Sequence, residues 1–64
     1  MNQENVEMKM LHYRGYDDDE LLLSIVALAR MFRTVHSNYL SGLVESIVAA
    51  TTVEQERKEE VQIK

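Results

Sequence analysis

The N-terminal part of the chain alternates between apolar and polar residues. In residues 6–16, VEMKMLHYRGY, apolar side chains first stand at every second position, and their parity changes between Met10 and Leu11. Alternation with a period of two is typical of a strand that buries one face. We therefore predict a short strand, and the change of parity leaves two registers open.

A second pattern, with a period of three to four residues, follows the predicted strand. The segment YDDDELLLSIVALARMF, residues 16–32, places apolar residues at helical spacing, which predicts a helix. Asp17 can accept hydrogen bonds from the free amides of the first turn, and Glu20 can bond back to the backbone of Asp17 in a capping box. Leu23 and Val26 widen the apolar face, so we expect this helix to be buried on two sides.

The same spacing predicts a second helix after a short elbow. Thr34 is a good N-cap for this helix, and Ser37 is a weaker alternative one turn later. The helical spacing of apolar residues continues through Ala50. We expect residues 1–5 to be disordered, residues 6–51 to form one domain, and residues 52–64 to form a polar helix extension or a tail.

The composition indicates a small oligomeric protein. The 64 residues include no cysteine, so neither a disulfide nor a cysteine metal site can supplement a small core, and a second copy of the chain is the expected source of stability. The first residues lack the pattern of a secretory signal. The longest apolar stretch, residues 21–29, is far shorter than the roughly 20 residues that cross a bilayer. We expect a cytoplasmic protein that does not enter a membrane.

Patterns typical of catalytic or metal sites are missing from the sequence. His12 and His36 have no partner at the spacing that forms a metal pair on a helix. The acidic run from Asp17 to Glu20 lacks the glycine and the distal glutamate of a calcium loop, and helix capping explains it. No glycine-rich phosphate loop is present. We therefore expect no enzyme activity, no metal and no cofactor.

The predicted order of strand, helix, elbow and helix indicates an intertwined homodimer. A single short strand cannot pair within its own chain, and a second copy supplies the pairing strand by two-fold symmetry. The apolar faces of the two helices then form the dimer core, for which the candidates are Leu22, Ile25, Leu28, Tyr39, Leu40, Leu43, Val44 and Ile47.

The elbow and the helix after it resemble ribbon-helix-helix repressors of the Arc/MetJ type. The match is carried by Arg33, Thr34, Val35 and Ser37. Phe32 stands where that family usually has glycine, and His36 stands where asparagine is common. The resemblance implies a mainly α fold in which two chains form a two-stranded antiparallel ribbon. It also implies a homodimeric DNA-binding repressor that regulates transcription on double-stranded DNA, with room for higher-order assembly there.

The resemblance also assigns the contacts with DNA. Outward side chains of a ribbon in the major groove contact base edges. One register directs Met10, His12 and Arg14 toward the bases, and the other directs Lys9, Leu11 and Tyr13 there. The first register is better chemistry because Arg14 can make a bidentate contact with guanine. The expected phosphate contacts at the start of the second helix are Arg33, Thr34, Val35 and His36.

An alternative function is that of a helical protein-interaction module without DNA binding, such as an antitoxin or an inhibitor of a partner protein. The net charge of −4 favours this alternative, because proteins that neutralise phosphates usually carry a basic surface. The polar segment from Thr52 is then a candidate for folding on a protein partner. The segment Met8–Arg14 separates the two hypotheses, because a helix there favours the interaction module.

Overall fold

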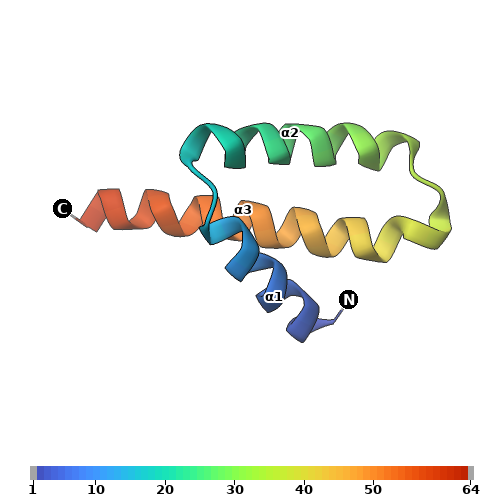
Figure 1. Cartoon of the computed structure of the whole chain (residues 1–64), viewed down its shortest axis with the longest axis horizontal. Coiled ribbons are helices and arrows are strands. Elements are labelled where there is room, and N and C mark those ends of the chain that lie inside the picture. Colours follow the sequence, from blue (N-terminus) through green and yellow to red (C-terminus); the bar gives the residue numbers. More distant parts are fainter. Residues whose placement is uncertain (1, 64) are drawn as a thin grey trace.

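The protein is a three-helix structure arranged around one long helix. The computed structural model describes the backbone of residues 2–63 and the side chains of residues 2–60. Its elements are α1 (Gln3–Arg14), α2 (Asp18–Thr34), the short 3-10 helix η1 (Ser37–Tyr39) and α3 (Leu40–Ile63). Helix α2 runs antiparallel to α3, and α1 crosses α3 obliquely on another of its faces (Figure 1). The last turns of α3 extend beyond both other helices (Figure 1).

The ribbon-helix-helix fold predicted from the sequence is wrong, because the segment predicted to be a strand is helix α1. No strand occurs in residues 2–63. A two-stranded ribbon between two chains therefore has no strand from which to form, and the intertwined dimer based on it is also wrong. Helix α1 begins at Gln3 and α3 continues to Ile63, while the expected division of the chain after residues 5 and 51 stays a prediction.

Capping and packing explain why the first segment is helical. The Asn2 side chain accepts hydrogen bonds from the amides of Glu4 at 2.8 Å and Asn5 at 3.3 Å, as an N-cap does. Val6, Met10 and Tyr13 have the spacing i, i+4 and i+7, which places them on one side of a helix. Val6 is buried, and the other two pack against the core. The apolar residues of this segment therefore fit the period of a helix as well as that of a strand, and contact with α3 stabilises the helix.

The start of α2 confirms the capping box predicted from the sequence. The Glu20 amide donates to Oδ1 of Asp17 at 2.8 Å, and the Asp17 amide donates to Oε1 of Glu20 at 3.0 Å. These two bonds satisfy donors that the first helical turn leaves without partners. The four residues that begin the helix are therefore specified locally.

The elbow differs from the prediction that Thr34 caps the second helix. Thr34 is the last residue of α2, and its hydroxyl donates to the carbonyl of Met31 at 3.4 Å. Val35 and His36 are extended, and η1 then leads into α3. Threonine near a helix end can bond back to the preceding turn, and here that bond replaces forward capping of the next helix.

The core is small and is centred on α3. Leu21, Ala50 and Val53 form its centre, and Met10, Tyr13, Tyr16, Ile25 and Leu28 pack around them. The small side chains of Ala49 and Ala50 are fully buried, so α3 can be approached closely where its neighbours cross. The buried apolar residues of the described region are Val6, Leu21, Leu43, Ala49, Ala50 and Val53. A core of this size leaves a separate monomer marginally stable.

Within the described region, none of the helices combines the length and the apolar character that crossing a membrane requires.

Candidate protein-interaction surface

The residues expected to contact bases do not share one outward face. Successive residues of a helix are rotated by about 100°, so Met10 and Arg14 share one side of α1 and His12 points to the other side. Met10 and Tyr13 pack against the core. His12 lies edge to face with Tyr13 and Tyr16, and its Nε2 is 3.1 Å from the Tyr16 hydroxyl. In a helix, alternate residues do not share one face, and the predicted base contacts depended on such a face.

The two cations of α1 are bonded to α3. Nζ of Lys9 donates to the Gly42 carbonyl at 2.9 Å and lies 3.6 Å from Oε1 of Glu45. The Arg14 guanidinium forms an ion pair with Glu56 at 3.2 Å. Both side chains hold α1 in place, so they are committed to contacts within the chain.

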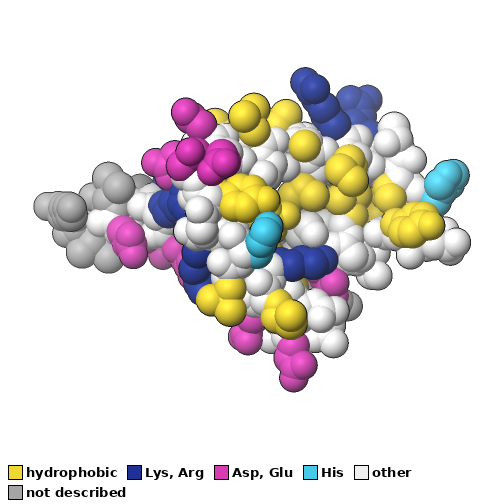
Figure 2. Space-filling view, in the orientation of Figure 1, with side chains coloured by type: hydrophobic (Ala, Val, Ile, Leu, Met, Phe, Trp, Pro, Cys, Tyr) yellow, Lys and Arg dark blue, Asp and Glu magenta, His cyan; other side chains and the backbone are white. Residues whose placement is uncertain are grey.

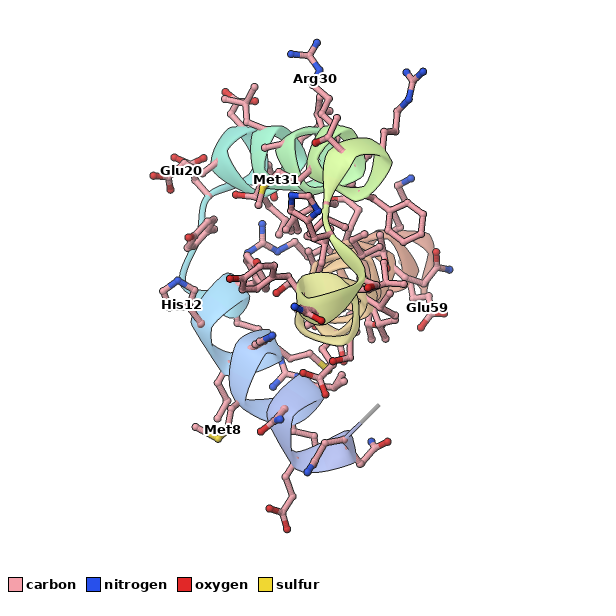
Figure 3. All side chains as sticks on the ribbon, turned by 90° about the vertical axis from the view of Figure 1, so that its right-hand side faces the viewer. Met8, His12, Glu20, Arg30, Met31 and Glu59 are labelled. Atoms are coloured by element: carbon pink, nitrogen blue, oxygen red, sulfur yellow. The ribbon has the colours of Figure 1, made fainter. Side chains whose placement is uncertain are left out.

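The two most exposed apolar side chains of α1, Met8 and Leu11, border two different hollows. Met8 lies beside a hollow that Lys9 and Ser46 also line, whereas Leu11 lines a second hollow with Val48 and Thr52. Figure 3 shows Met8 and His12 on the side of the molecule to which Glu20 also projects, and Glu59 on the other side. Because Met8 and Leu11 are three residues apart, they are neighbours on the exposed side of α1.

The residues expected to contact phosphates are spread along the elbow. Arg33 is in the last turn of α2, the Thr34 hydroxyl is bonded within that turn, Val35 is half-buried and His36 is exposed. The amides of Val35 and His36 precede the three-residue helix η1. Because η1 leads directly into the long helix α3, the phosphate contacts at this helix start stay a prediction.

Glu45 is a buried carboxylate that the sequence reasoning missed. Its side chain accepts a hydrogen bond from the Asn2 amide at 2.9 Å and lies against Lys9. The bond from Asn2, together with the positive charge of Lys9, holds the pKa of Glu45 below its usual value, although burial acts in the opposite direction. An acid inside the apolar run LVESIVAA, residues 43–50, was the available signal. Glu45 ties the start of α1 to α3.

Arg57 is a second polar anchor that sequence reasoning missed. Its guanidinium donates to the Tyr16 carbonyl at 2.6 Å and to Oδ1 of Asp18 at 2.7 Å. A further bond reaches the Arg14 carbonyl at 3.4 Å. One side chain of α3 thus holds the turn between α1 and α2, because the planar guanidinium can donate in several directions.

The residues expected to form a dimer core divide between the interior and the surface. Ile25 and Leu28 pack against the core and Leu43 is buried. The exposed members are Leu22, Tyr39 and Leu40. Val44 and Ile47 of α3 line an apolar hollow together with Ala29 and Phe32 of α2. Three of the eight predicted residues therefore lie in the interior, three are exposed, and two line the hollow.

The outward apolar residues of α2 form one stripe. Leu22, Val26 and Ala29 follow the spacing i, i+4 and i+7, which places them along one flank of the helix. Leu22 is 55% exposed, Val26 is 43% exposed and Phe32 beside them is 47% exposed. We call Leu22, Val26 and Ala29, with the hollow at Phe32, Val44 and Ile47, the apolar stripe. Contiguous exposed apolar surface of this kind marks interaction sites.

Charges of opposite sign lie at the two ends of α2. The first turn is acidic, with Asp18, Asp19 and Glu20, and the last turn carries Arg33. Figure 2 shows acidic side chains gathered where α2 begins and basic side chains where it ends. Arg30, near that second end, points away from α3 (Figure 3). The apolar stripe is thus flanked by acid at one end and base at the other.

Neither similarity to known proteins nor a metal-binding geometry in the described residues points to a function. The described residues contain no group of three or more histidine, cysteine or acidic side chains that can hold a metal ion. No family model matches the chain, and no curated protein or solved structure was found to be similar to it. None of these comparisons tests the family resemblance itself, although α1 contradicts the fold that it implied.

Proposed function

We propose that this chain is a protein-interaction module that docks on a helical partner through the apolar stripe. The observation that carries the proposal is the exposure of Leu22, Val26 and Phe32 along one flank of α2, beside a hollow with apolar walls. An exposed helix flank with anchors at i, i+4 and i+7 has the geometry of helix-to-helix docking. Function then consists of burying this flank against another protein.

The gain from such burial is sizeable for so small a chain. Full burial of a leucine, valine or phenylalanine side chain stabilises by about 1.5–3 kcal/mol. Leu22, Val26 and Phe32 are each close to half exposed, so each contributes about 1 kcal/mol when a partner covers it. This gain is comparable to a large part of the stability of a domain of this length, about 0.05–0.15 kcal/mol per residue.

Three observations support this function over DNA binding. The segment Met8–Arg14 lies within α1, and a helix there favours the interaction module. Lys9 and Arg14, which were the cationic candidates for base contacts, are paired with Glu45 and Glu56. The net charge of −4 also disfavours binding to a polyanion such as DNA.

Site-specific photo-crosslinking tests the proposal. A photoreactive residue replaces Val26 in the stripe, and a control variant carries it at Glu7, an exposed position of α1. Crosslinking is carried out in cells that express the chain and with the purified chain alone. We expect a discrete protein adduct from position 26 and none from position 7. Adducts at equal yield from both positions, or none from position 26 in either setting, contradict the proposal.

A DNA titration is the matching control. Fluorescence anisotropy of labelled random-sequence duplex DNA is measured with the purified chain at low salt. We expect no binding. Tight binding that falls steeply with salt, and that Lys9→Gln or Arg14→Gln weakens, contradicts an interaction module without DNA binding.

A further inference from the structure

We infer that the occupant of the apolar stripe is a second copy of this chain, with the two α2 helices packed antiparallel about a two-fold axis near Val26. This inference rests on the proposed function and names the partner. The argument comes from the order of side chains along α2, from the shape of the stripe and from the size of the core.

The charges along α2 are placed so that this helix is complementary to a second copy of itself that runs in the opposite direction. Asp19 lies seven residues before Val26, and Arg33 lies seven residues after it. Seven residues are close to two helical turns, so the three side chains share one flank of the helix. When two such helices pair antiparallel at Val26, Asp19 of each copy faces Arg33 of the other. The helix therefore offers two ion pairs at the ends of an apolar contact.

The apolar residues between these charges are also complementary. In the same register, Leu22 lies four residues before Val26 and Ala29 lies three residues after it, so Leu22 of each copy comes within one residue, about 1.5 Å along the helix, of Ala29 of the other. Leu22 is more than half exposed, and the small side chain of Ala29 lines the hollow with Val44 and Ile47. A projecting leucine thus meets a recess, which is the arrangement of a knob packed into a hole. Two-fold symmetry repeats the contact on both sides of the axis.

The charges distinguish this arrangement from a parallel one. A parallel pairing in register places Asp19 against Asp19 and Arg33 against Arg33, and like charges across a helix pair are unfavourable. Asp18 is paired with Arg57 within the chain. Asp19 and Arg33 take part in no ion pair among the side chains of residues 2–60. These two charges are therefore available to a second copy.

The small core gives the second copy an energetic role. The described region buries few large apolar side chains fully, with Leu21 and Val53 the largest of them. A chain of this length without disulfides or metal commonly gains stability by association. Two copies joined at the stripe add a shared apolar layer made of two α2 helices and the adjoining flank of each α3. Folding and self-association then support each other.

Charge exchange tests the inference. Sedimentation equilibrium of the purified chain measures the dimer dissociation constant of the wild type and of the variants. Asp19→Arg and Arg33→Asp are each expected to weaken the dimer by about tenfold or more, because each replaces two attractive pairs by two repulsive ones. The chain that carries both substitutions, and a mixture of the two single variants, are expected to recover association. The control Glu59→Arg changes an exposed charge of α3 and is expected to leave the constant unchanged.

Disulfide trapping tests the direction of pairing, since the chain contains no cysteine of its own. Val26→Cys is expected to form a disulfide-linked dimer readily, because the two-fold axis brings the two copies of this position together. Asp19→Cys alone is expected to remain unlinked, because its two copies are about 21 Å apart along the helices at a rise of about 1.5 Å per residue. A mixture of Asp19→Cys and Arg33→Cys is expected to form a mixed disulfide.

The outcomes separate this inference from the proposed function. A monomer at every concentration overturns the second copy as occupant, and a protein adduct from position 26 in cells then leaves the interaction module standing. Rapid linking of Asp19→Cys to itself overturns antiparallel pairing. A dimer that survives Val26→Asp, with helicity unchanged by circular dichroism, shows that the copies meet elsewhere and also overturns the inference.

Discussion

Replacement of Leu21 by alanine is expected to remove much of the stability of this protein, whereas the same replacement at Leu23 is expected to have little effect. Both leucines lie in the first turns of α2. Leu21 is fully buried between Ala50 and Val53, and Leu23 is 70% exposed. The two substitutions delete the same atoms from the same helix, so their difference reports burial alone.

The expected size of the effect follows from the burial. Leucine-to-alanine changes in packed cores cost about 2–5 kcal/mol, through lost transfer free energy and the cavity that remains. At an exposed position such as Leu23 the same change stays within about 0.5 kcal/mol. A chain of this length has a total stability of about 3–10 kcal/mol. Leu21→Ala therefore brings the protein close to complete unfolding.

Urea denaturation followed by circular dichroism at 222 nm measures both variants. With a slope of about 1 kcal/mol per molar urea, a loss of about 3 kcal/mol lowers the midpoint for Leu21→Ala by about 3 M, or abolishes the folded baseline. Leu23→Ala is expected to keep the wild-type midpoint. Equal shifts for the two variants would refute the packing of α2 on α3 as described, because they would place both side chains in similar surroundings.

Two further predictions concern the polar anchors of α3. Because the pKa of Glu45 is lowered in the folded state, the unfolded chain binds more protons, and the contribution of Glu45 to stability is present above its unfolded pKa and lost as pH falls through the folded value. Urea midpoints of the wild type and Glu45→Gln between pH 2.5 and 6.5 are expected to converge at the acidic end, and a constant gap at every pH would contradict the bonds to Asn2 and Lys9. Arg57→Ala is expected to cost about 1–2 kcal/mol and to raise amide hydrogen exchange in the turn that contains Tyr16. An unchanged exchange rate there would show that the guanidinium does not hold the turn.

The two proposals assign different roles to the two faces of α2. The face toward α3 carries Leu21, Ile25 and Leu28, which build the core. The flank with Leu22 and Val26 remains outward and is left for association. The sequence prediction that this helix is buried on two sides is consistent with such a division, and the oligomer measurements above are its test.

Local features of the sequence were sufficient to predict α2 and its start. The capping box at Asp17 and Glu20 involves residues three apart, so their hydrogen bonds form without help from distant parts of the chain. The apolar spacing of residues 16–32 was long enough to indicate a helix without ambiguity. The elbow after it was predicted near the correct place, but its capping at Thr34 was wrong because the hydroxyl bonds backward to Met31.

Only the tertiary structure decided that the first segment is a helix and which residues the charged side chains contact. Val6, Met10 and Tyr13 fit a helical face, and the neighbouring alternation also fitted a strand, because a short apolar pattern is compatible with both periods. Contact with α3 resolved this ambiguity. Glu45 and Arg57 contact residues about forty positions away along the chain, so no local spacing predicts them. The sequence by itself determined which segments can be helices and where α2 begins. Packing on α3 determined which helix faces are buried and which flank of α2 remains exposed, because burial depends on neighbours that are distant in sequence.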